Sequence, residues 1–315
     1  MSDATAAPVL VGSGENTYVW ESDFFKLPDG VRIERNTHQI QIDRQGRIYV
    51  HSPSDHAVIV FDSQGGFLSS WGSWMAPGAH GMQIREEDGV EYLYFATTNQ
   101  HFVSKTTLDG REVFRLGAPK EGGLYQNESL YNPTNVAFAP NGDFYVADGY
   151  GLFYIHQYTR EGKFVRSWGG RGSEPGKMQC PHGIFVDTWG KEPFVVVADR
   201  ENHRLQRFTL DGKHVDFVAS ELRRPCHFDI LGDLTLIPDL LGRVTLFDRD
   251  YKLVAHLGDN PREAERANNG IPRKGFREGH FIAPHGACFD KAGNIYVAEW
   301  VADGGRLTRL RKESR

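Results

Sequence analysis

The chain has few cysteines and no long apolar run. Only three cysteines occur among its 315 residues, Cys180, Cys226 and Cys288, which are too few and too scattered for a disulfide framework. No apolar stretch approaches the roughly 20 residues that cross a bilayer, and residues 1–14 lack the basic segment and apolar core of a secretion signal. We therefore expect a protein of a reducing compartment, in the cytoplasm, without a membrane partner.

An excess of positive charge is also missing. The formal net charge is −5, whereas a nucleic-acid partner usually requires a basic face. Glycine and aromatic residues, by contrast, are plentiful, with 35 Gly, 15 Pro and 12% aromatics. This composition suits many short strands joined by tight turns, and the length allows two domains or one large all-β domain.

Most of the chain is one unit repeated. Its clearest copy, within 180–208, has a Pro-His pair opening an apolar run, a turn, a second apolar run ending in Asp199-Arg200, and a third run that alternates apolar and polar residues. The copies span 37–71, 180–219 and 225–258, with others starting at residues 79, 133 and 284. Six copies that begin about 40 to 60 residues apart, each with enough residues for up to four strands, predict an all-β, six-bladed β-propeller.

The sixth copy ends after its third strand. The segment T-Y-V-W at 17–20 reads as a strand and is the candidate that completes the sheet, closing the ring and covering two sheet edges. We therefore expect a tail at 1–16 and a single propeller domain at 17–315. The insertions 117–132 and 259–283 lie between copies, and the second, which is polar, is expected to be a surface loop or partial lid.

Chemistry is expected at one mouth of the central channel. The first strand of each blade lines the channel and the second strand returns beside it, so the starts of first strands and the ends of second strands share one face. At the first-strand starts stand His38, His80, Thr134, His182, Cys226 and His285. A single Pro-His-Gly is explained by turn chemistry, with the ring bonded to the next blade. The set of histidines instead indicates a metal, because three imidazoles from separate blades leave one coordination position open, as in catalytic zinc sites.

The ends of the second strands carry acids, hydroxyls and two further candidates. They read Ser52, Thr97, Asp148, Tyr150, Asp199, Arg200, Asp239 and Glu299. Tyr150 can act as a general acid or base if a metal or cation lowers its pKa. Arg200 can hold a carboxylate bidentately or form a salt bridge with one of the acids. The acids themselves are typical of blade corners, where carboxylates accept backbone N–H bonds.

The repeats resemble NHL repeats, and the order of motifs resembles the peptidyl-α-hydroxyglycine α-amidating lyases. The most specific segments are A-H-G-M at His80, V-A-D-G-Y at Tyr150, P-H-G-I at His182, A-D-R-E-N at Arg200 and P-H-G-A at His285. The resemblance implies that the three histidines bind a catalytic zinc or another divalent transition metal. It also implies that Tyr150 transfers a proton and that Arg200 belongs to the active site.

Four features depart from that family. The family's arginine at the end of the second strand of blade one is absent, because residues 51–56 read H-S-P-S-D-H. Gly286 follows the histidine of copy six, where the family has an acid that helps to bind a structural calcium. This leaves a Ca²⁺ site in doubt, although the carbonyls of Ile40 and Met82 could still face the axis. His38 is additional, and the family's disulfides have no counterpart.

The reaction implied by the resemblance is a lyase step on a small molecule. An N-substituted α-hydroxy acid would lose its C–N bond to give an amide and an aldehyde acid, so the substrate would bear a carboxylate. The residues alone indicate metal-assisted chemistry on an oxygenated small molecule. Two alternatives remain open: a non-catalytic NHL propeller that binds a protein partner, and a lactonase-like propeller hydrolase.

Overall fold

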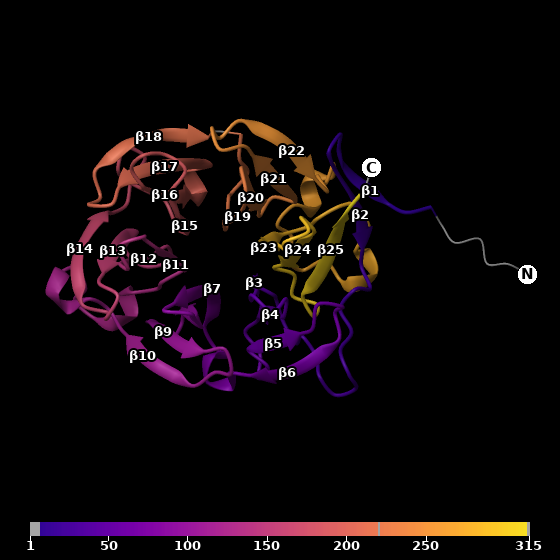
Figure 1. The fold of residues 1–315 in the computed structure, drawn as a ribbon, viewed down its shortest axis with the longest axis horizontal. Coiled ribbons are helices and arrows are strands. Elements are labelled where there is room, and N and C mark those ends of the chain that lie inside the picture. Colours follow the sequence, from indigo (N-terminus) through magenta and orange to yellow (C-terminus); the bar gives the residue numbers. More distant parts are fainter. Residues whose placement is uncertain (1–6, 220, 314–315) are drawn as a thin grey trace, which may run out of the picture.

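The protein is a six-bladed β-propeller, as predicted. A computed structural model describes residues 7–219 and 221–313, and Figure 1 shows six antiparallel sheets arranged in a ring around a common axis. Within these ranges, no helix has the length and apolar character needed to cross a membrane. Each repeat found in the sequence forms one blade.

The first three blades follow the chain in order, with their first strands innermost. Blade one contains β3 (Gln39–Ile42), β4 (Ile48–His51), β5 (Val58–Phe61) and β6 (Phe67–Trp71). Blade two contains β7 (Ala79–Glu87), β8 (Val90–Thr97), β9 (Phe102–Thr107) and β10 (Glu112–Leu116). Blade three contains β11 (Asn135–Phe138), β12 (Phe144–Ala147), β13 (Tyr154–Tyr158) and β14 (Phe164–Gly169).

The last three blades complete the ring. Blade four contains β15 (Pro181–Asp187), β16 (Phe194–Asp199), β17 (Arg204–Thr209) and β18 (His214–Ala219). Blade five contains β19 (Asp229–Leu231), β20 (Leu234–Asp239), β21 (Arg243–Phe247) and β22 (Leu253–Leu257). Blade six contains β23 (Pro284–Phe289), β24 (Ile295–Glu299) and β25 (Arg306–Lys312). Short 3₁₀ helices lie in the connections: η1 (Ser73–Met75), η2 (Lys120–Gly122), η3 (Glu128–Leu130), η4 (Arg200–Asn202), η5 (Glu263–Glu265) and η6 (Arg273–Gly275).

The turns between strands follow from local side-chain chemistry. After β3, the Asp43 carboxylate accepts the backbone N–H groups of Gln45 and Arg47 at 2.9 and 2.8 Å. Gly46 closes this turn with a φ of 83°, a conformation that side chains disfavour. This combination reverses the chain tightly enough for β4 to pair with β3.

The N-terminal segment closes the ring, as predicted. Strand β2 (Asn16–Glu21) pairs antiparallel with β25, and β1 (Leu10–Ser13) pairs with β2, so blade six is a five-stranded sheet. Figure 1 shows β2 and β1 at the outer edge of this sheet, near the C-terminus, with β2 next to β25. The ordered sheet therefore begins at Leu10, within the segment 1–16 that was expected to be a tail.

The core is divided among the seams between blades. Each of the six seams contains its own cluster of buried apolar side chains. In the seam between blades one and two, for example, Val58 and Met82 are fully buried in one cluster. Because every blade is held on both sides by close-packed apolar contacts, the starts of the inner strands are fixed around the axis.

The insertion 259–283 is packed against the mouth. Its end, Ile282 and Ala283, is buried in a seventh apolar cluster that also contains Cys226, Leu240 and Val301. The backbone N–H of Ala267 donates to the carbonyl of Ile282 at 2.8 Å. The insertion is therefore a fixed wall of the mouth in this structure.

Candidate metal centre at the propeller mouth

The three predicted ligands share one local structure. His80, His182 and His285 are each the second residue of the first strand of a blade, and a glycine follows each of them. At each of these positions the pairing with the second strand shifts register. A bulge of this kind re-aims a side chain, which explains how the three rings reach the axis from three separate sheets.

The following glycine lets the next blade approach. A Cβ atom at Gly81 would lie 2.3 Å from the carbonyl oxygen of Thr134, and one at Gly183 would lie 2.7 Å from that of Cys226. The same carbonyl oxygens accept the Nδ1–H of the preceding histidines. The Nδ1···O distances are 2.9 Å from His80 to Thr134, 2.7 Å from His182 to Cys226, and 2.8 Å from His285 to His38. The protons are thus held on Nδ1, and each Nε2 keeps its lone pair.

The rings form a compact buried group. Ring centroids are 4.8 Å apart for His80 and His182, 4.9 Å for His80 and His285, and 4.7 Å for His182 and His285. Among the described residues, His80 Nε2 is buried without a hydrogen-bond partner. Burial lowers the pKa of His80 to about 3 and holds the pKa values of His182 and His285 well below the usual range. Neutral imidazole is the form that binds metal, so these residues fit a transition-metal ion.

Two further residues, which precede the first strands of blades one and five, lie beside this group. Potential ligand atoms lie within 4.8 Å of one another in two sets, His38 with His80 and His285, and His182 with Cys226 and His285. The predicted trio takes His80 from the first set, His182 from the second and His285 from both, and its three potential ligand atoms do not all lie within 4.8 Å of one another. Burial raises the pKa of the Cys226 thiol to about 12, so without an ion this group is a neutral thiol.

Tyr150 and Arg200 meet at the edge of the histidine group. Tyr150 lies in the turn after β12, and Arg200 opens η4 after β16. Arg200 Nη1 donates to the Tyr150 hydroxyl at 2.9 Å, and that hydroxyl lies 3.0 Å from His182 Nε2. Since His182 donates from Nδ1, the Tyr150 O–H is the donor to Nε2. Burial raises the pKa of Tyr150, and Arg200 partly opposes this rise. The tyrosine is therefore a neutral phenol at neutral pH.

Two residues of this network were missed in the sequence. Arg200 forms an ion pair with Glu201 at 3.0 Å, and Glu201 also pairs with Arg224 at 2.6 Å. The acid at the end of β16, Asp199, pairs with Arg204 at 2.8 Å instead. A salt bridge of Arg200 with a strand-end acid was one of the two alternatives, and the partner is instead Glu201. Two features of the sequence could have indicated these partners. Glu201 directly follows Arg200 along the chain, and Arg224 directly precedes the entry to blade five.

The other residues predicted around the mouth form hydrogen bonds to backbone groups. The strand-end acids accept backbone N–H groups, as the structural alternative predicted. The donors are Asn132 to Asp148 at 2.7 Å, Gln179 to Asp199 at 2.6 Å, Arg223 to Asp239 at 2.9 Å and Ile282 to Glu299 at 2.6 Å. The hydroxyls of Ser52, Thr97 and Thr134 donate to backbone carbonyls. These groups therefore orient the chain around the mouth.

A cavity of about 670 Å³ opens above the histidines. His38, His80 and His285 lie in its wall with Tyr150 and Arg200. The remainder of the wall combines cationic, amide and apolar side chains, among them Arg35, Arg224, Asn36, Asn99, Asn132, Leu240 and Trp300. The volume suits a small molecule, and the cations suit an anionic group.

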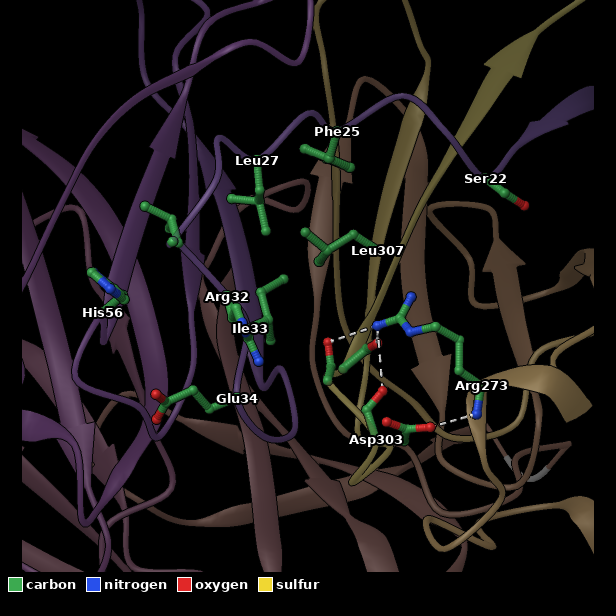
Figure 2. Close-up of a pocket in the computed structure, with 14 residues that line it drawn as sticks. Ser22, Phe25, Leu27, Arg32, Ile33, Glu34, His56, Arg273, Asp303 and Leu307 are labelled. Atoms are coloured by element: carbon green, nitrogen blue, oxygen red, sulfur yellow. Dashed lines mark hydrogen bonds between the residues drawn. The ribbon is translucent and has the colours of Figure 1, made fainter.

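A second cavity of similar volume lies away from the channel. Figure 2 shows its wall, formed by the segment between β2 and β3 and by residues 303–307. Arg273 spans its edge, donating from the backbone to Asp303 at 2.7 Å and from the side chain to the carbonyls of residues 303–305. No candidate site residue lines this cavity.

The position of the family's calcium-binding acid is filled differently. A Cβ atom at Gly286 would lie 2.1 Å from Gln39 Oε1, so the Gln39 side chain occupies the space where a longer side chain would begin. Its oxygen is an amide oxygen, whereas calcium sites rely on carboxylates among several oxygen ligands. The residues at this point do not supply such a carboxylate.

The fold and the histidine centre define a β-propeller with a candidate metal site at one mouth of its channel. No family model matches the chain. Its sequence is 30% identical over 253 residues to the peptidyl-glycine alpha-amidating monooxygenase of Mus musculus, covering 78% of this chain. It is 26% identical over 254 residues to peptidyl-alpha-hydroxyglycine alpha-amidating lyase 1 of Drosophila melanogaster, covering 73% of this chain. It is also 28% identical over 175 residues, 53% of this chain, to NHL repeat-containing protein 3 of Homo sapiens.

The chain is an NHL-repeat propeller that resembles the peptidyl-α-hydroxyglycine amidating lyases. It spans 25% of the length of the mouse monooxygenase, 44% of the Drosophila lyase and 49% of the human NHL protein. Solved propellers share its fold. A streptogramin B lyase aligns with a TM-score of 0.63 at 12% identity, over 96% of this chain and 98% of that one. A virginiamycin B lyase from Staphylococcus aureus aligns with a TM-score of 0.57 at 13% identity, over 94% and 87%.

Proposed function

We propose that this protein is a metal-dependent carbon–nitrogen lyase. Its substrate would be a small N-substituted α-hydroxy acid, and its products an amide and an aldehyde acid. His80, His182 and His285 would hold a divalent transition metal, with zinc the first candidate. When bound, the ion supplies Lewis acidity toward the substrate hydroxyl or carboxylate oxygen.

The observation that carries the proposal is the convergence of three histidines with the same orientation, since a tether to the next blade by itself is also what turn chemistry predicts. Each ring is bonded through Nδ1 to a backbone carbonyl of the next blade, which leaves the lone pair on Nε2 for another partner. Metal-binding histidines are typically oriented by such a second bond. At His182 this lone pair accepts the Tyr150 O–H, a hydrogen bond that a bound ion would replace. The donors are imidazoles and not carboxylates, which supports a transition metal over the calcium typical of propeller lactonases.

Tyr150 is the proposed proton carrier. The reaction moves one proton: the substrate hydroxyl loses it, the C–O bond becomes a carbonyl, the C–N bond breaks, and the amide nitrogen receives the proton. The Tyr150 hydroxyl lies within hydrogen-bond distance of His182 Nε2 and of Arg200 Nη1. Arg200 partly opposes the rise of the Tyr150 pKa that burial causes, and a bound divalent cation would favour the phenolate that accepts the substrate's proton. Tyr150 is 41% exposed, toward the cavity that would take the substrate.

Arg200 is the proposed anchor for the substrate carboxylate. Its Nε is engaged by Glu201 and its Nη1 by Tyr150. Neither of these two hydrogen bonds uses Nη2. Because Arg200 also lines the cavity, Nη2 is the atom proposed to bind the substrate carboxylate. A guanidinium held in a fixed orientation can bind a carboxylate with little further loss of freedom.

The test is a substrate panel run on the metal-loaded protein. N-acyl and N-aryl α-hydroxyglycines are incubated beside lactones and esters, and amide and aldehyde acid are measured as products. The proposal predicts conversion of at least one α-hydroxyglycine and no hydrolysis of lactones. Hydrolysis of lactones alone would reject it, and so would the absence of turnover together with the absence of bound metal.

A further inference from the structure

His38 differs from the other three histidines of the mouth in its hydrogen bonding and in its local backbone. It is 9% exposed, and its Nδ1 is buried without a hydrogen-bond partner among the described residues. Gln39 follows it instead of glycine, and the pairing of β3 with β4 runs without a register shift. Within the described ranges, no carbonyl of a neighbouring blade tethers this ring in the way that the other three are tethered.

His38 nevertheless faces two of the proposed ligands. Its ring centroid lies 5.0 Å from that of His80 and 4.9 Å from that of His285. These separations match those within the proposed trio, which range from 4.7 to 4.9 Å. The four rings thus form two triangles that share the His80–His285 edge, with His38 at one outer corner and His182 at the other.

The His38 triangle meets a distance requirement of a three-histidine site. The potential ligand atoms of His38, His80 and His285 all lie within 4.8 Å of one another. All four rings line one narrow internal space of the channel. A buried imidazole nitrogen without a partner is costly unless something binds it.

We propose that His38, His80 and His285 form a second binding position for the divalent transition metal, next to the position bounded by His182. The ion would be held by either triangle, with His80 and His285 common to both. This inference rests on the proposed metal centre and adds to it a ligand that the amidating-lyase resemblance does not supply.

The inference makes the two outer histidines individually dispensable for metal retention. Each variant is loaded with Zn²⁺, passed through a desalting column, and its metal measured by elemental analysis. His38→Ala and His182→Ala should each keep about one ion per chain, held more weakly than in the wild type. The double variant His38→Ala/His182→Ala should lose the ion. His80→Ala and His285→Ala should each lose it alone, because each belongs to both triangles.

His51→Ala is the matched control. His51 is a buried histidine of β4 whose ring packs on Phe95 and forms no ring pair with the proposed ligands among the described residues. It should keep the ion. Thermal melting checks that every variant is folded, and the pair His38→Asn/His182→Asn repeats the double substitution with smaller polar side chains.

The outcomes separate the two proposals. If the wild type binds an ion and His182→Ala alone abolishes binding, the second position is rejected and the proposed function stands. If the folded double variant keeps its ion, His38 is not the alternative ligand and the inference is rejected as well. If the wild type binds no transition metal, both proposals fail. Replacement of the ion by Co²⁺ gives a second readout, since His38→Ala and His182→Ala should then show different absorption spectra.

Discussion

The residue after each tethered histidine sets how closely two blades meet. At Gly81 the carbonyl of Thr134 comes within 2.3 Å of the position that a Cβ atom would take. That carbonyl is also the acceptor that orients His80. Glycine therefore links the packing of the seam to the orientation of a proposed ligand.

Replacing Gly81 with Ala should weaken both the packing of the seam between blades two and three and the orientation of His80. The added methyl group must push back a backbone carbonyl, which costs about 1–3 kcal/mol of stability and moves the acceptor of His80 Nδ1. We expect a lower melting temperature and faster loss of the ion to a chelator. Gly117→Ala is the control, because a Cβ atom there would lie 4.0 Å from its nearest non-neighbouring atom. Equal effects of the two substitutions would show that the close approach at Gly81 is unimportant.

Tyr150→Phe removes only the hydroxyl that joins Arg200 to His182. The ring remains, so fold and metal content should be unchanged. Turnover should fall by about a hundredfold or more, because the proton carrier is lost. Steady-state kinetics on an α-hydroxyglycine that the wild type converts gives the answer. A variant that matches the wild-type turnover number would remove Tyr150 from the mechanism.

At the scale of elements, β1 and β2 close the ring of blades. Tyr18 and Trp20 of β2 are 0% and 4% exposed and lie in the apolar cluster between blades five and six. Their burial contributes roughly 5 kcal/mol, in addition to the hydrogen bonds between β2 and β25.

Deleting the residues before Asp23 should therefore lower the melting temperature by about 10 °C or more. Differential scanning calorimetry of the truncated and full-length chains measures this change. Leu10→Ala, at a side chain of β1 that is 49% exposed, should leave the midpoint nearly unchanged. A truncated chain that melts like the intact one would mean that β2 contributes little to closure.

A buried histidine of blade three makes stability depend on pH. His156 Nε2 lies 2.7 Å from the Tyr125 hydroxyl and Nδ1 lies 2.7 Å from that of Ser167. Burial lowers the pKa of His156 from 6.5 to about 3. Between these two pKa values the unfolded chain binds a proton here and the folded chain does not. This contribution to stability is complete above the unfolded pKa and is lost as the pH falls toward the folded one.

His156→Gln should flatten the acid side of the stability profile. Urea unfolding at about pH 7.5 and about pH 5, on either side of the unfolded histidine pKa, should show a smaller loss of unfolding free energy in the variant than in the wild type. Asp148 acts in the opposite direction, because burial raises its pKa to about 7, but it is present in both proteins. Parallel pH profiles of variant and wild type would contradict the assignment.

At the scale of the whole molecule, the sequence predicts the ring and where its chemistry converges. Repetition marks the blades, and the histidines at 80, 182 and 285 recur at one register of the repeat. Their meeting follows from propeller geometry alone. The local order of apolar runs and turns is consistent with that geometry throughout, which is why the prediction succeeded.

The parts that the sequence did not predict depend on contacts between blades. Strand β1 has no counterpart in the repeat. The pairing of Arg200 with Glu201 and Arg224 joins blades four and five. The missing tether of His38 becomes visible only when the carbonyls of the neighbouring blade are in place.

Metal-dependent turnover tests the central claim most directly. The protein is stripped with a chelator, its metal content is measured, and conversion of an N-acyl-α-hydroxyglycine to amide and aldehyde acid is followed before and after one equivalent of Zn²⁺ is added. The account predicts about one ion per chain before stripping, loss of turnover with the ion, and recovery on its return. Unchanged turnover in metal-free protein, or protein that binds no transition metal, would contradict it.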